Sequence, residues 1–135
     1  MTPTAMAQRP IELILMRQLA ATLAMPIFLV DPAGTLVFFN PAAEAILGLR
    51  FDETGEMPVQ EWGERWYPQT DDGEPLQPDQ LPLSVAVAER RAAHAAFWIT
   101  AHDGTRRHIH VTAIPLIVVT GEVVGAAAFF WEAPR

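Results

Sequence analysis

The chain contains no cysteine, and this absence excludes several kinds of chemistry at once. Disulfide bonds, thiolate nucleophiles, cysteine-ligated zinc and iron–sulfur clusters all need the missing side chain. The sequence therefore excludes stabilisation by disulfide bonds and catalysis by a thiol.

Basic residues are scarce. Nine Lys and Arg residues stand against sixteen Asp and Glu residues, which gives a formal net charge of −7 and a pI near 4.9. Unaided binding to nucleic acid or to an anionic membrane surface needs a basic stripe, and the sequence has none. We expect neither a nucleic-acid nor a membrane partner.

Long hydrophobic runs are also absent. No window of the sequence approaches the roughly 18 to 20 apolar residues that a membrane span needs. The first ten residues, MTPTAMAQRP, lack the apolar centre of a signal peptide. The sequence therefore predicts a cytoplasmic protein.

Hydrophobic residues make up half of the 135 positions, which is enough for one domain with a real core and argues against extensive disorder. Residues 1–10 are polar and contain proline, so we predict a flexible tail there. Residues 11–24 predict a helix that flanks the domain, and residues 25–135 predict the domain itself.

The predicted helix over residues 11–24 is unusually apolar. Its polar residues do not gather on one side, whereas a helix on the surface of a small domain needs only one apolar stripe. The helix is either fully buried or held between its own domain and a partner. The second interpretation predicts a dimer interface formed by Ile11, Leu15, Leu19 and Leu23.

Residues that favour turns and helix starts define the next elements. Residues 27–30 and 35–39 predict two strands joined by the turn Asp31-Pro32-Ala33-Gly34. Both strands are apolar on both faces, so their outer face needs a cover, and the N-terminal helix is the candidate. Asn40 and Pro41 favour the start of a helix that continues to Leu47.

The second half predicts the rest of the sheet. Five prolines between residues 50 and 82 predict loops and short helical turns, followed by a helix from residue 78 to residue 91. Strands then follow around the turns Asp103-Gly104 and Thr120-Gly121-Glu122. The fold class is α+β, a five-stranded antiparallel sheet with short helices inserted between strands 2 and 3.

Four segments resemble parts of a PAS domain, and they are residues 26–43, 72–83, 102–106 and 113–130. In the first segment, Asp31, Gly34 and Asn40 stand at the spacing of the family's first hairpin and helix start. In the third, Asp103-Gly104 resembles its later hairpin. The chain departs from many family members after Trp131, where the Asp-(Ile/Val)-Thr junction is missing.

This resemblance implies a sensory or protein-interaction module and not an enzyme. It implies a cavity between the inner sheet face and the short helices, which could hold a small apolar ligand. It also implies a homodimer through the N-terminal helix and an unidentified signalling protein as partner, in signal transduction or transcription regulation. The alternative is an adaptor with a filled core and no ligand.

Large apolar residues are the candidates for lining that cavity, and they are Trp62, Trp66, Val87, Trp98, Ile109 and Val111. The competing interpretation is that they simply fill the core. Alternation in the strand after Asp103-Gly104 places Ile109 and Val111 on the inner face.

The identity of any cofactor stays open. A flavin held as a cysteinyl adduct, known among light-sensing relatives, is excluded because there is no cysteine. Haem is not expected, because family members that bind it usually carry an axial His on the helix before the third strand. The corresponding helix here has none, and His94 lies beyond its end.

The remaining histidines lie near the second hairpin. His108 and His110 share one face of a strand, roughly 6 to 7 Å apart. His102 would complete a metal site, but the parity of the hairpin turns it to the other face, so we predict no metal.

Catalysis is not expected either. The clustered carboxylates, Glu61, Glu64, Asp71 and Asp72, fall in a predicted solvated loop, and acid–base work would require burial.

Overall fold

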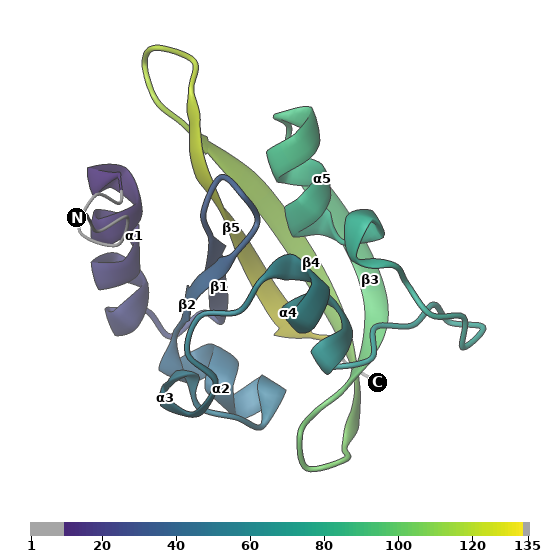
Figure 1. Cartoon of the computed structure of the whole chain (residues 1–135). Coiled ribbons are helices and arrows are strands. Elements are labelled where there is room, and N and C mark those ends of the chain that lie inside the picture. The colour runs from purple at the N-terminus through teal and green to yellow at the C-terminus, as the bar shows by residue number, and fades with distance from the viewer. Residues whose placement is uncertain (1–9, 134–135) are drawn as a thin grey trace.

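The molecule is described by a computed structural model that covers residues 10–133. Its elements lie in three layers: one helix, a sheet, and a layer of short helices (Figure 1). The flexible tail predicted for residues 1–10 falls outside the described residues, apart from Pro10. Among the described residues, no helix is long and apolar enough to cross a membrane.

Five antiparallel strands form the sheet, and they are β1 Ile27–Val30, β2 Leu36–Phe39, β3 Ala93–Thr100, β4 Arg106–Ile117 and β5 Val123–Glu132. Their spatial order is β2-β1-β5-β4-β3. The hairpin β1–β2 and the hairpin β3–β4 are therefore joined through β5, which pairs with β1 on one side and with β4 on the other. The last strand in sequence lies at the centre of the sheet.

The Asp103-Gly104 turn joins β3 to β4 as the sequence predicts. Gly104 has a φ of 91°, which few other residues adopt without strain. The backbone N–H of Thr105 donates to Asp103 Oδ1 at 3.0 Å and lowers the pKa of the Asp103 carboxyl below its usual range. The turn thus carries its own local hydrogen bond.

The part of the chain that connects β2 to β3 forms short helices, which cover the inner face of the sheet. They are α2 Pro41–Leu47, α3 Phe51–Thr54, α4 Val59–Arg65, η2 Pro78–Gln80 and α5 Pro82–Glu89. The single helix predicted over residues 78–91 is in fact two. Leu81, with φ −76° and ψ 147°, is extended between them. The residue before a proline avoids the helical region, and Pro82 follows.

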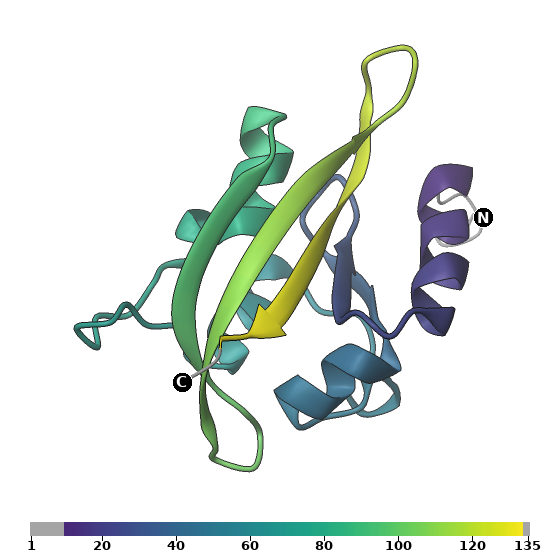
Figure 2. The same ribbon diagram turned by 180° about the vertical axis from the view of Figure 1, so that it is seen from behind.

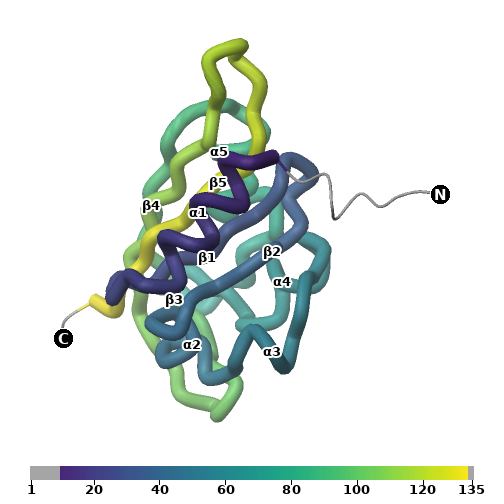
Figure 3. Tube along the Cα trace, turned by 90° about the vertical axis from the view of Figure 1, so that its left-hand side faces the viewer, coloured from purple at the N-terminus to yellow at the C-terminus, as the bar shows by residue number. Residues whose placement is uncertain are grey.

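Helix α1, Ile11–Thr22, lies on the opposite face of the sheet (Figure 3). It packs against β2 and β5, and its buried residues are Leu13 and Ala20. With Ile27, Leu29, Val37 and Ala127 they form a small second core. This confirms that the N-terminal helix covers the outer face of the first hairpin.

The outer face of β3 and β4 has no helix over it within residues 10–133 (Figure 2). Burial alternates along these strands, so that Phe97, Ile99, Ile109 and Val111 are buried on the inner face. The intervening residues are exposed or half-buried. The predicted α+β sheet, with helices inserted between strands 2 and 3, is confirmed.

Candidate functional site

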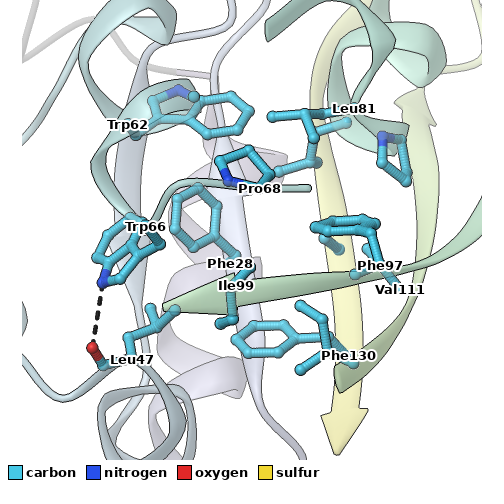
Figure 4. Close-up of a pocket in the computed structure, with 15 residues that line it drawn as sticks. Phe28, Leu47, Trp62, Trp66, Pro68, Leu81, Phe97, Ile99, Val111 and Phe130 are labelled. Atoms are coloured by element: carbon cyan, nitrogen blue, oxygen red, sulfur yellow. Dashed lines mark hydrogen bonds between the residues drawn. The ribbon is translucent and has the colours of Figure 1, made fainter. Parts of the chain in front are cut away.

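An apolar cavity of about 80 Å³ lies between the inner sheet face and the helical layer (Figure 4). Its lining comes from all parts of the chain and consists of Phe28, Leu47, Trp62, Gly63, Trp66, Pro68, Leu81, Pro82, Leu83, Phe97, Ile99, Ile109, Val111, Ala128 and Phe130. Every one of these side chains is apolar. The cavity therefore offers a ligand shape complementarity and dispersion contacts.

Two tryptophans form the helical wall. Trp62 lies on α4, and Trp66 follows four residues later at its end, so both rings project from one side. Trp62 Nε1 donates to the Gly34 carbonyl at 2.8 Å, and Trp66 Nε1 donates to the Leu47 carbonyl at 3.1 Å. Their polar atoms are thus already occupied, which leaves only the ring faces and edges to a ligand.

The opposite wall is the sheet itself. Alternating residues of β3, β4 and β5 reach into the cavity, and Ala128 on central β5 is the smallest side chain among them. Phe28 on β1 closes one side, where its ring lies edge-on to Trp62 at 5.2 Å between centroids and to Trp66 at 6.2 Å.

The structure brings four of the six predicted pocket residues together. Trp62, Trp66, Ile109 and Val111 all line the cavity. Val87 packs against the same core but does not line the cavity, because it lies on the part of α5 that borders a separate surface hollow.

Trp98 corrects the sequence interpretation. Its two neighbours on β3 point into the core, so the alternation of the strand directs Trp98 to the outer face. There its ring lies 4.8 Å from that of His108, its partner across the strands. The prediction that Trp98 lines the cavity is wrong.

Phe28, Leu47 and Phe130 also line the cavity, although the sequence pattern does not predict them as lining residues. In β1 and β5 every position is apolar or small, so no period-2 contrast marks the inner residues. Leu47 ends a helix whose orientation depends on Asn40. For Phe130, extending the alternation of β4 across the second hairpin would have supplied the signal.

The outer face carries a row of five rings with a guanidinium over one of them, which we call the outer-face row: Arg106, Trp98, His108, His110, Trp131 and His94. The His108 and His110 rings lie 6.0 Å apart, and His110 stacks on Trp131 at 5.7 Å with 9° between planes. His108 and His110 thus share the face opposite Ile109 and Val111, as the alternation of the strand predicts. His102 lies apart from them, exposed in the turn between β3 and β4.

Asp71 closes one end of the outer-face row. Its Oδ1 accepts from Trp98 Nε1 at 3.1 Å and lies 3.5 Å from His108 Nε2. Nevertheless, within residues 10–133 no three His, Cys, Asp or Glu residues are grouped as a metal ion requires. The carboxylates Glu61, Glu64 and Asp72 are exposed as well.

The fold and the cavity together place the protein in a general structural class. A mixed sheet-and-helix domain encloses a small apolar cavity on one sheet face and presents a helix and bare strands on the other. Comparison with protein families then identifies it: the family model described as PAS fold matches residues 21–133. The chain belongs to the PAS fold family, whose members are generally sensory or signalling modules.

Solved structures agree on the fold. The PAS domain of BvgS from Bordetella pertussis is 18% identical, with a TM-score of 0.62 over 92% of this chain and 87% of that one. The PAS domain of the fruit-fly ELK potassium channel is 10% identical, with a TM-score of 0.71 over 91% and 98%. The LOV protein of Rhodobacter sphaeroides is 12% identical, with a TM-score of 0.71 over 93% and 70%.

The comparison with curated proteins found no match. At these low identities the likeness to solved structures shows the fold alone.

Proposed function

We propose that this protein is a sensory PAS module that binds a compact, uncharged, apolar molecule in its cavity and dimerises through α1. The observation that carries the proposal is an apolar cavity on one face of the sheet combined with an exposed apolar stripe on the helix across it. Signal transduction or transcription regulation would then proceed through a separate partner protein.

The lining supports an apolar ligand. Both indole N–H groups at the cavity are bonded to backbone carbonyls, and the other lining side chains carry no polar atom. A hydroxyl placed there would lose its water without gaining a partner, at a cost of about 1 to 3 kcal/mol. The site thus selects against polar metabolites.

The volume supports a small ligand. An apolar cavity of about 150 Å³ lined by Leu, Ile and Phe holds benzene or xenon. The cavity here is about 80 Å³, so benzene is an upper limit on ligand size and enters only if lining side chains move outward. A flavin or haem would need a large rearrangement of the helical layer. The lining residues that the structure describes also include no histidine to serve as a haem ligand.

The exposed side of α1 supports a dimer. Ile11 is 64%, Leu15 56% and Leu19 53% exposed, and Leu23, which is 36% exposed, follows α1 in extended backbone. Ile11, Leu15 and Leu19 recur every four positions, so they form one line along the helix. A second copy of the chain that presents the same line would bury it.

The two features would be coupled by a shift in population. A ligand in the cavity changes the output only if it binds one arrangement of α1 on the sheet more tightly than another. The sheet separates cavity and helix by a single layer, because Ala127 contacts the α1 side while Ala128 lines the cavity. A small displacement of β5 would therefore reach both.

The alternative is an adaptor with a filled core. The small volume of the cavity favours it, since side-chain movements could close such a space. Native mass spectrometry of the purified protein separates the two: a bound extra mass supports the sensor.

The direct test uses the four tryptophan indole N–H signals in a ¹H–¹⁵N NMR spectrum. Trp62 and Trp66 line the cavity, whereas Trp98 and Trp131 lie on the outer face. We expect added benzene to shift the first two signals and leave the other two in place. Phenol, which adds one hydroxyl, should bind roughly tenfold or more weakly.

A matched pair of variants controls this test. Ala128→Val places two extra carbons in the cavity and should abolish the benzene shifts. Ala96→Val makes the same change on the exposed outer face of β3 and should preserve them. Equal shifts of all four indoles, or binding that survives Ala128→Val, would contradict a ligand site in this cavity.

A further inference from the structure

We infer that the side chain of Asn40 caps two helices: its oxygen holds the start of α2, and its nitrogen holds the end of α1 on the domain. The attachment of α1 can therefore be weakened without weakening that of α2. Among residues 10–133, Asn40 is the polar side chain that the fold buries completely, with 0% exposure. A fully buried amide is retained only where its hydrogen bonds are made.

The oxygen side of the amide organises the domain. Asn40 Oδ1 accepts from Ala43 N at 3.0 Å, which caps the first turn of α2, and from Ile27 N at 3.0 Å, which fixes the start of β1. These two bonds are the helix-start role that the sequence predicts, together with an anchor on the neighbouring strand.

The nitrogen side of the same amide holds α1. The two hydrogens of Asn40 Nδ2 face three carbonyls: those of Ala20 at 2.9 Å and Met25 at 2.8 Å, and, in a longer shared contact, that of Leu23 at 3.3 Å. Ala20 lies in the last turn of α1, where its carbonyl also accepts from the backbone N–H of Leu23 at 3.2 Å, and the other two carbonyls lie in the connection to β1. The amide therefore completes the C-terminal end of α1.

Only an amide of this length satisfies both sides. Two N–H groups face its oxygen and three carbonyls face its nitrogen, so the orientation of the amide is fixed by its partners. A carboxylate would serve the first set and oppose the second. Asp at this position would still cap α2, since Asp is as good an N-cap as Asn.

Asn40 also connects α1 to the cavity. It follows Phe39, which stacks on the cavity residue Phe28 with centroids 5.8 Å apart, and it caps the helix that ends at the cavity residue Leu47. The inference rests on the proposed function for its signalling role, because it names the residue through which the cavity walls would move α1. The hold on α1 itself is independent of any ligand.

The test is Asn40→Asp, followed by hydrogen–deuterium exchange of α1 and α2. To remove protection by a partner copy, both the parent and the variant also carry Leu15→Glu and Leu19→Glu. We expect amides in residues 11–23 to exchange roughly five- to tenfold faster, which is the effect of losing one helix cap, while residues 41–47 change little. This split would not arise from a general loss of stability.

Two outcomes would overturn the inference. Unchanged exchange in α1 would mean that the amide nitrogen does not hold the helix, and equal acceleration in α1 and α2 would mean that Asn40 only supports the fold. If Asn40→Asp does not fold, Asn40→Ser replaces it, because Ser caps α2 but is too short to reach all three carbonyls. No ligand or dimer enters the measurement, so its failure leaves the proposed function standing.

Discussion

Gly125 shows how one missing side chain sets the distance between α1 and the sheet. A Cβ at this position would lie 2.6 Å from the carbonyl oxygen of Val30 and 3.1 Å from Leu13 Cδ1. The first atom belongs to the backbone of the neighbouring strand and cannot move without disturbing the pairing of β1 with β5. Gly125 thus permits both the strand pairing and the seat of Leu13.

Gly125→Ala is therefore expected to destabilise the protein by about 1 to 3 kcal/mol, the usual cost of overpacking. Urea denaturation followed by far-UV circular dichroism measures the change. Gly73→Ala is the control, since an added Cβ there meets nothing within 4 Å although φ is also positive, at 83°. A loss at Gly125 no larger than the loss at Gly73 would show that the close approach is unimportant.

At the scale of an element, α1 has two faces with different roles. One face seats Leu13 and Ala20 on the sheet, and the other leaves Leu15 and Leu19 more than half exposed. An apolar stripe on an otherwise acidic protein is costly to leave in water. This is why the helix is the element on which the proposed dimer depends.

If the proposed dimer forms through α1, the double substitution Leu15→Glu and Leu19→Glu should convert it to a monomer without unfolding the domain. Buried like charges on both copies would face each other, whereas in the monomer both side chains are solvated. Size-exclusion chromatography with light scattering at tens of micromolar measures the mass.

The control is Ala21→Glu with Ala24→Glu, which adds the same charge at two exposed positions, one on another side of α1 and one beyond its end. Ala21 lies about 120° around the helix from Leu15. A parent chain that is already monomeric, or a mass unaffected by the Leu substitutions, would refute the α1 interface.

The whole molecule depends on its last strand. β5 is paired with β1 on one side and with β4 on the other, so it is the link between the two hairpins. Isolated two-stranded hairpins are at best marginally stable in water. The sheet can therefore form only after the C-terminal strand has been added.

A chain ending at residue 122 should lose its cooperative thermal transition, because each remaining hairpin would expose its inner face. A chain ending at residue 133, which keeps all of β5, should melt like the full protein. Circular dichroism during heating distinguishes them. A cooperative transition in the shorter chain would show that the helices alone can bridge the hairpins.

The sequence by itself determined the five strands, their order and the start of α2, although the helix predicted over residues 78–91 is divided in the structure. Turn chemistry at Asp103-Gly104 and the Asn40-Pro41 helix start depend on neighbouring residues, and these local preferences survive in the fold. Alternation in β4, where polar residues separate Ile109, Val111 and Ala113, was enough to assign its faces. Local physics therefore accounts for most of the architecture.

The tertiary structure decided which faces of the strands are buried and which distant residues contact one another. In β3, Phe97, Trp98 and Ile99 are all large and apolar, so only the register with β4 shows that Trp98 faces outward. The second role of Asn40 joins atoms about twenty positions apart, which no local pattern encodes. Long-range packing selects among faces and partners that a one-dimensional pattern leaves equivalent, because burial is a property of the assembled layers.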